Sequence, residues 1–248
     1  MTSTSLNSID RHKINSLNLF EYGSSSFFSN LEAQAQILPL GKGQVLFLHE
    51  DQAERFFVIK KGRIKLFRET LDGAQAVVDV LTVDHIFGET AIFQEDLYPY
   101  SAEATEPTEV ISLPLSILKA EIEKNQKLAL TMLSSMARYR KHQDQELEHR
   151  TIQSAPQRIG CFLLGLTNQE SNGEAVINLP YDKTLVASRL GMQPETFSRA
   201  LRRLKKETGI EIKGASIKVD NLNQLSEYSC SACSSEFPCK DLKASRAS

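Results

Sequence analysis

Two sets of side chains recur at helical spacing between Pro194 and Lys206. One set is polar and would form a single face: Glu195, Ser198, Arg199 and Arg202. These residue types suit base edges in the major groove of DNA, because arginine donates two hydrogen bonds to guanine, glutamate accepts from cytosine and serine adapts to several bases. The other set is apolar and should face a core: Phe197, Leu201 and Leu204. The segment is therefore predicted to be a helix that presents a DNA-reading face.

Further basic residues extend the charge toward the end of this helix, where we expect phosphate contacts: Arg203, Lys205 and Lys206. Residues 178–220 hold nine lysines and arginines against five acidic residues, although the whole chain has a formal net charge of −2. Phosphate contacts dominate nucleic-acid affinity, so a basic segment on an acidic chain indicates a DNA-binding region. The plainer alternative is an ion pair between Glu195 and Arg199, four residues apart on one helix.

A shorter helix is predicted just before this one. Asp182 is a suitable N-terminal cap for KTLVASRL, and Gly191 suits its left-handed end. Pro194 then falls in the first turn of the next helix, where a missing N–H costs nothing. Two short helices joined by a glycine-containing turn are typical of a helix-turn-helix. The following IEIKGASIKVDN predicts a two-stranded wing with Gly214 in its turn.

The earlier part of the chain changes pattern near Pro114. From Ala35 to Leu113, short β-like runs separated by glycines favour an antiparallel sandwich or barrel, and Asp72-Gly73 predicts a hairpin. Beyond Pro114 the pattern is helical, with no glycine or proline in residues 128–149. The apolar positions on this long helix are candidates for a dimer seam: Leu130, Leu133, Met136, Ala137 and Leu147.

Two segments resemble the Crp/Fnr superfamily. The helix-turn-helix segment K-x-x-x-A-x-x-L-G-M-x-P-E-T-F-S-R-x-L-x-x-L is similar to the one in that superfamily, and RFFVIKKGRIKLF…DGAQAVVDVLTVDHIFGETAIF resembles its β-roll. The resemblance implies an α+β chain with an N-terminal cyclic-nucleotide-binding-like β-roll, a long dimerisation helix and a C-terminal winged helix-turn-helix. We expect the sensor roll with its lead-in at 1–113, the dimerisation helix region at 114–152, the DNA-binding domain at 153–225 and a cysteine-containing tail at 226–248.

The same resemblance implies partners and a signal. The E-x-x-S-R arrangement at Glu195, Ser198 and Arg199 is similar to the Fnr-like branch, which implies a homodimer on double-stranded DNA with palindromic, TTGAT-like half-sites. RNA polymerase is a further expected partner. Proline at position 194 and the neighbouring ETFSR look most like the Dnr-like regulators. The expected function is a transcription regulator that responds to redox state, oxygen or nitric oxide.

The candidate effector pocket of the roll departs from the cyclic-AMP-binding members, where a G-E segment and a following R-[ST]-A cradle the ribose and the cyclic phosphate. Gly88-Glu89 is present here, but the second motif reads Tyr100-Ser101-Ala102. A buried phosphate charge must be paired, and tyrosine supplies no positive charge. The sequence therefore argues against cyclic AMP, and Glu89 is expected to be a structural residue of the roll.

Three cysteines gather in the segment CSACSSEFPC: Cys230, Cys233 and Cys239. Thiolates at this spacing can hold a soft metal or an iron–sulfur cluster, and in a reducing compartment such clusters are more often metal-binding or redox-active than stably disulfide-bonded. Some superfamily members carry oxygen-labile [4Fe–4S] clusters on C-terminal cysteines, which makes that cluster the first candidate. Zinc, a thiol–disulfide switch and a tail without metal are the alternatives.

The sequence also offers candidates for a fourth metal ligand and for a haem site. The fourth metal ligand could be a small molecule or one of several side chains: Asp144, Glu146, Asp241 or Cys161. Cys161 lies in an apolar helix, where a buried inert thiol is the better expectation. Haem is an alternative cofactor because Dnr-like proteins are associated with haem-dependent nitric-oxide sensing. The candidate haem ligands are His85, taken first, and then His12, His49, His142 and His149.

Other classes of protein explain the sequence less well. No Ser-His-Asp order, phosphate loop or paired carboxylates point to an enzyme, and an effector-binding module without DNA would leave residues 182–219 unexplained. No apolar run approaches the ~18–20 residues of a membrane span, and MTSTSLNSIDRHK lacks the apolar core of a secretory signal. We therefore expect a cytoplasmic protein that has no membrane partner.

Overall fold

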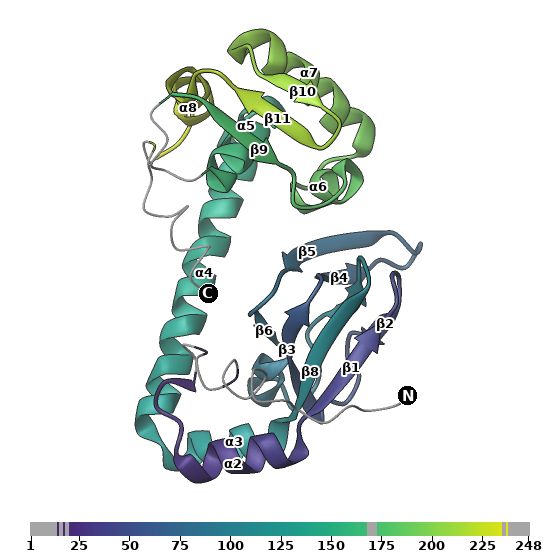
Figure 1. Ribbon diagram of the computed structural model, residues 1–248, viewed down its shortest axis with the longest axis vertical. Helices are drawn as coiled ribbons and strands as arrows, with labels where there is room; N and C mark the ends of the chain where they lie inside the picture. The colour runs from purple at the N-terminus through teal and green to yellow at the C-terminus, as the bar shows by residue number, and fades with distance from the viewer. Residues whose placement is uncertain (1–13, 15–16, 18–19, 168–172, 235–236, 238–248) are drawn as a thin grey trace. The chain divides into compact units, whose positions relative to one another are not determined.

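The computed structural model describes residues 14, 17, 20–167, 173–234 and 237 (Figure 1). They form two compact units, divided after Met136. The first unit contains a β-roll and the second a winged helix-turn-helix, and a long helix contributes residues to both. This confirms the predicted order of roll, long helix and winged domain.

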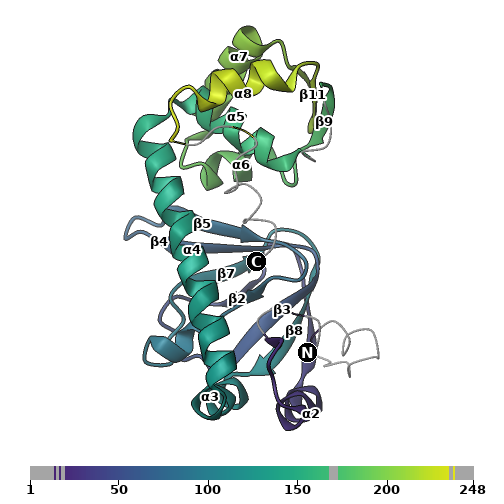
Figure 2. The same cartoon turned by 90° about the vertical axis from the view of Figure 1, so that its left-hand side faces the viewer.

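The roll consists of two four-stranded sheets whose neighbouring strands are antiparallel. The first sheet has the order β1 (Gln36–Leu40), β8 (Thr108–Pro114), β3 (Arg55–Lys61) and β6 (Ile86–Phe87). The second has the order β2 (Val45–Phe47), β7 (Ser101–Ala104), β4 (Ile64–Glu69) and β5 (Gln75–Leu81), side by side in Figure 2. The predicted hairpin joins β4 to β5, and Gly73 in its turn has a φ of 82°.

Aromatic rings fill the interior of the roll. Phe47 stacks on Tyr98 with 3.7 Å between ring centroids, and Phe57 stacks on Phe87 at 5.3 Å. Aromatic pairs of this kind stabilise a core beyond the area they bury. The 3-10 helix η2 (Glu89–Phe93) follows β6 and begins at Gly88, whose φ of 84° suits glycine.

Three helices complete the first unit. The helix α2 (Ser25–Gln34) begins at Ser24, whose Oγ accepts from the Phe27 N–H at 3.1 Å. A carboxylate oxygen of Glu121 in α3 (Leu115–Lys124) accepts from the Ser24 N–H at 3.0 Å, which ties α2 to α3. The long helix α4 (Gln126–Ile152) buries Leu128 in the roll core near its start. None of the described helices is long and apolar enough to span a membrane.

The second unit surrounds a three-stranded sheet of the order β10-β11-β9. Its helices are α5 (Ala155–Leu166), α6 (Lys183–Arg189), α7 (Pro194–Thr208) and α8 (Leu222–Cys230). Its strands are β9 (Ala175–Asn178), β10 (Glu211–Lys213) and β11 (Ser216–Val219). The two-stranded wing is thus present as predicted, with Gly214 at φ 63°, and β9 adds a third strand to it.

The helix α8 packs closely against α5. Leu225 is fully buried, and so is Ser229. A Cβ atom placed on Gly160 of α5 would lie 2.0 Å from the Ser229 Oγ and 3.2 Å from its Cβ. Only glycine permits this approach of the two helices. The Ser229 Oγ is itself buried, and no other residue that the structure describes forms a hydrogen bond with it.

This close approach predicts the effect of two substitutions. Gly160→Ala should lower the free energy of unfolding of the second unit by about 1–2 kcal/mol, because overpacking costs about 1–3 kcal/mol and alanine returns up to about 1 kcal/mol of helix propensity. Adding Ser229→Ala removes the clashing oxygen and should restore most of the loss. The measurement is urea unfolding of the four variants of this double-mutant cycle. Equal destabilisation with and without Ser229→Ala would contradict the packing described.

Candidate nucleic-acid interface

The helix-turn-helix is formed by α6 and α7. The Asp182 carboxylate accepts from the Leu185 N–H at 2.9 Å and caps α6, as predicted. Gly191 has a φ of 64° in the turn, and the Met192 N–H donates to the Ala187 carbonyl oxygen at 2.8 Å. Pro194 is the first residue of α7. These local interactions set the angle at which α7 leaves the turn.

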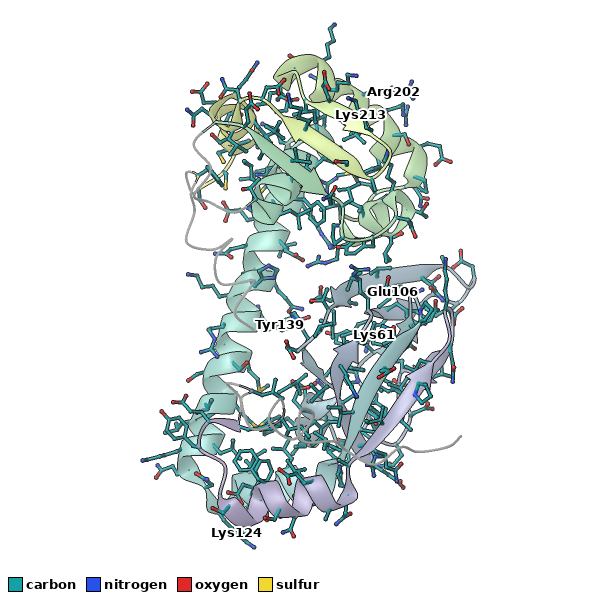
Figure 3. All side chains as sticks on the ribbon, viewed as in Figure 1. Lys61, Glu106, Lys124, Tyr139, Arg202 and Lys213 are labelled. Carbon is teal, nitrogen blue, oxygen red and sulfur yellow. The ribbon has the colours of Figure 1, made fainter. Side chains whose placement is uncertain are left out.

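The apolar and the polar residues of α7 lie on separate faces of the helix, as the sequence predicts. The buried residues are Phe197, Ala200, Leu201, Leu204 and Thr208. The predicted DNA contacts are all exposed: Glu195, Ser198, Arg199, Arg202, Arg203, Lys205 and Lys206. Figure 3 shows Arg202 pointing away from the body of the second unit, and its Nε donates to the Ser198 carbonyl oxygen at 3.3 Å. The structure thus gathers these residues on one accessible surface.

The alternative explanation of this face was an ion pair between Glu195 and Arg199. In the part of the chain that the structure describes, these two side chains form no ion pair. Both are exposed, and Glu195 lies in the first turn of α7, where a negative charge favours the helix. The side chains are therefore available to a ligand.

The end of α4 is tied to α6 by an ion pair. The Arg189 guanidinium donates through Nη1 and Nη2 to the two carboxylate oxygens of Glu146, and only 13% of the Arg189 side chain is exposed. Burial alone would raise the pKa of Glu146, but hydrogen bonding and charge from Arg189 outweigh it and lower that pKa. Glu146 is therefore a structural anchor of the helix-turn-helix, contrary to its expected candidacy as a metal ligand.

One basic residue near this surface escaped the sequence analysis. Lys213 ends β10 in the wing, with 84% of its side chain exposed, and Figure 3 shows it projecting from the strand. A phosphate contact from the wing would suit this charge. Its position in the sequence could have identified it, because Lys213 stands directly before the wing glycine, Gly214.

The predicted effector-pocket residues of the roll serve separate local roles. The Ser101 Oγ accepts from the His49 N–H at 3.0 Å, and the Arg68 guanidinium lies 6.0 Å from the ring centroid of Tyr100. Glu89 lies in η2. A cavity of about 370 Å³ in the roll is lined instead by other side chains, among them Phe47, Phe57, Tyr98 and Arg55.

Glu89 is the most perturbed carboxyl group of the roll. Burial raises its pKa to about 7, and the hydrogen bond from its own backbone N–H lowers that pKa only in part. Among the described residues no basic side chain pairs with Glu89. A group in this setting is largely protonated below neutral pH.

The described cysteines occupy different environments. Cys161 is buried in α5, as expected for an inert thiol. Cys230 ends α8, and Cys233 follows in a turn with its Sγ 3.6 Å from the His149 Nε2. Cys239 and Asp241 lie outside the described residues. Within the described residues no group of three histidines, cysteines or acidic residues is close enough to hold a metal ion.

The other candidate ligands are engaged elsewhere. Asp144 accepts from the Arg140 Nε at 2.9 Å. The His85 Nδ1 lies 3.1 Å from the Thr82 carbonyl oxygen, and the His49 Nε2 lies 2.6 Å from Arg68 Nη2. His142 lies 3.9 Å from Glu146, and His12 is outside the described residues. These contacts give no support to a haem site on the described histidines.

The fold and the exposed face of α7 define a class of protein: a DNA-binding regulator with a sensor roll. Two family profiles match the chain, the cyclic nucleotide-binding domain over residues 37–125 and the Crp-like helix-turn-helix domain over residues 157–228. The chain belongs to the Crp/Fnr family of transcription regulators.

Individual relatives agree with this assignment. The solved structure of a candidate cyclic nucleotide binding protein from Ruegeria pomeroyi is 32% identical, covers 90% of this chain and 99% of that protein, and has a TM-score of 0.60. The fumarate and nitrate reduction regulatory protein of Vibrio cholerae is 27% identical over 80% of this chain and 82% of its own length. The CRP-like cAMP-activated global transcriptional regulator of Mycobacterium tuberculosis is 24% identical over 84% of this chain and 94% of its own length.

The raised pKa of Glu89 predicts a pH dependence of stability. The folded state binds the proton more tightly than the unfolded chain, so stability falls as pH rises from about 4.5 to about 7. Glu89→Gln should remove this loss, which amounts to up to about 3 kcal/mol. Urea unfolding at pH 5 and pH 8 tests this, with exposed Glu69→Gln as control. The prediction is refuted if Glu89→Gln differs in stability from the parent by the same amount at pH 5 and at pH 8.

Proposed function

We propose that this regulator is a homodimer that reads a palindromic DNA site with TTGAT-like half-sites, has RNA polymerase as a partner, and responds to redox state, oxygen or nitric oxide. The observation that carries the DNA-reading part is the exposed polar face of α7. Glu195, Ser198 and Arg199 lie on that face, in the part of a recognition helix that contacts base edges. Arg203, Lys205 and Lys206 add charge for phosphates.

The proposed dimer rests on the exposed apolar side chains of α4. Leu130, Leu133 and Leu147 are 55%, 56% and 65% exposed, and Met136 and Tyr139 are also exposed. Water-exposed leucines in a helix are normally covered by a partner when they recur on one side. A second copy of α4 is the matching partner, because a two-fold axis along this helix would also give two copies of α7 for a palindromic site.

The proposed signal rests on the roll and on the cysteines. The roll offers Tyr100 where a cyclic phosphate would need a positive charge, and no basic side chain among the described residues pairs with Glu89. We therefore do not assign cyclic AMP as the effector, although one relative is named for activation by it. The cysteine segment is the sensor we propose, and Cys230, Cys233 and Cys239 would hold its metal or cluster. If the bound group were a [4Fe–4S] cluster, oxygen would destroy it, and its loss would be the signal.

Base reading by α7 is tested by a pair of substitutions. Arg199→Ala should weaken binding to a TTGAT-type palindrome by about 10- to 100-fold for each half-site, because a bidentate arginine–guanine contact contributes about 1–3 kcal/mol. Lys206→Ala should weaken binding to specific and non-specific DNA alike and reduce the slope of log K against log salt by about 0.9 per chain. Gel shifts and salt titrations measure both effects.

Two results would argue against this assignment. Equal losses of specific and non-specific binding in Arg199→Ala would place Arg199 on phosphates rather than bases. Failure of the unsubstituted protein to prefer the palindrome over scrambled DNA would reject the proposed half-site.

The dimer seam is tested by Leu133→Glu, which places a charge in the proposed apolar contact. Burying one leucine contributes about 1.5–3 kcal/mol, so the dissociation constant of the dimer should rise at least tenfold and palindrome binding should weaken with it. Arg138→Glu lies on another side of α4 by helical geometry and serves as the control. Sedimentation equilibrium gives the constants, and equal effects of the two substitutions would contradict the seam.

A further inference from the structure

The joint between α4 and α5 is two residues long. The helix α4 ends at Ile152 and α5 begins at Ala155, and Ser154 between them has an extended backbone with φ −66° and ψ 159°. A short extended link can let two helices change their angle unless other contacts hold both of them. The end of α8 and the turn that follows it supply such contacts to both helices.

Gln157 connects the start of α5 to the end of α8 through a single amide group. Its Oε1 accepts from the Ser154 N–H at 2.9 Å and from the Ser154 Oγ at 2.7 Å, which caps α5. Its Nε2 donates to the Ser231 Oγ at 2.9 Å and to the Tyr228 carbonyl oxygen at 3.4 Å. A backbone N–H only donates and a carbonyl only accepts, so these partners fix which end of the amide faces α5 and which faces α8.

The last carbonyl groups of α8 accept hydrogen bonds from the joint. A helix leaves its final four carbonyl groups without partners in the helix. In α8 the Tyr228 carbonyl accepts from Gln157, and the Ser229 carbonyl accepts from the Gln153 Nε2 at 3.4 Å. Gln153 lies in the joint itself and is only 6% exposed. The end of α8 is therefore held on the joint by polar groups as well as by the packing of Ser229 against Gly160.

The turn after α8 also contacts the end of α4. The Ser234 N–H donates to the Glu148 Oε1 at 3.2 Å. The Cys233 Sγ lies 3.6 Å from the His149 Nε2, an ordinary distance for a hydrogen bond that involves sulfur. The chain from α8 onward thus binds both the helix before the joint and the helix after it, and bending at the joint would break several of these hydrogen bonds together.

We propose that Gln157 is a positioning residue that sets the spacing between half-sites which the dimer accepts on DNA. This role rests on the proposed homodimer and its palindromic site. The helix α4 carries the seam residue Leu147, whereas α5 packs against the recognition helix α7. The angle between α4 and α5 therefore determines where the two copies of α7 stand. Gln157 holds that angle because it ties the start of α5 to the segment that binds α4.

The length of DNA between the half-sites is the probe for this role. One added or removed base pair moves a half-site by about 3.4 Å along the axis of the duplex and rotates it by about 35°. A rigid joint penalises both changes, whereas a loosened joint tolerates them. A loss of stability or a general loss of DNA affinity would weaken binding at every spacing alike.

The test measures the affinity of the full chain for palindromes of the best spacing and of one base pair more or fewer. Gln157→Glu keeps an oxygen that caps α5 but replaces the donor to α8 by a second acceptor. We expect the preference for the best spacing to fall about three- to tenfold, because two hydrogen bonds are lost. Ser231→Ala removes one acceptor and should reduce the preference in the same direction by a smaller factor.

Gln224→Glu is the matched control. The Gln224 Nε2 donates to the Glu207 carbonyl oxygen at 3.3 Å, so this variant loses an amide–carbonyl hydrogen bond and changes the charge by the same amount at the start of α8, away from the joint. Its spacing preference should equal that of the parent. Hydrogen exchange in residues 222–234 reports whether the end of α8 is released, and it should become faster in Gln157→Glu.

Each contrary result has its own meaning. A sharp spacing preference that survives in Gln157→Glu, or one that falls equally in Gln224→Glu, overturns the positioning role of Gln157. Unchanged hydrogen exchange in Gln157→Glu shows that the amide does not hold α8 and overturns that role as well. An unsubstituted protein that binds a palindrome no better than a single half-site instead rejects the proposed homodimer on palindromic DNA, and the spacing role is rejected with it.

Discussion

The orientation of the recognition surface depends on the burial of four apolar side chains in α7. Phe197, Ala200, Leu201 and Leu204 lie in the core of the second unit, so α7 cannot rotate about its axis without exposing them. Burying each large side chain contributes about 1.5–3 kcal/mol, whereas the polar residues on the opposite face are exposed. The apolar face therefore decides which side chains meet a ligand. The ion pair between Arg189 and Glu146 then fixes α6, the helix against which α7 is set.

The roll shows how a fold can persist while the chemistry of its interior changes. The stacked rings of Phe47, Tyr98, Phe57 and Phe87 and the antiparallel sheets form the β-roll. In that interior a tyrosine stands at position 100, and no basic side chain among the described residues pairs with the Glu89 carboxyl group.

Much of this architecture could be predicted because local patterns specify it. The helical period of α7, the cap at Asp182 and the turn residues Asp72-Gly73 and Gly214 each act over a few residues. The short strands β6 and β7 and the helix α2 were not predicted, because β6 has two residues and β7 includes the polar positions Ser101 and Glu103. Such segments take their conformation from neighbours distant in sequence.

The contact between α4 and the turn after α8 was harder to predict for the same reason. His149 and Cys233 are separated by 84 positions, and no spacing in the sequence brings them together. The helix α8 was not predicted, although the Asn221 cap and the buried Leu222 and Leu225 specify it locally. Docking of α8 on α5 further decides the order of folding during synthesis. The α5 helix also packs against α7, but the part of α5 around Gly160 meets Leu225 and Ser229 of α8, so the DNA-binding domain completes its core only when α8 has been translated.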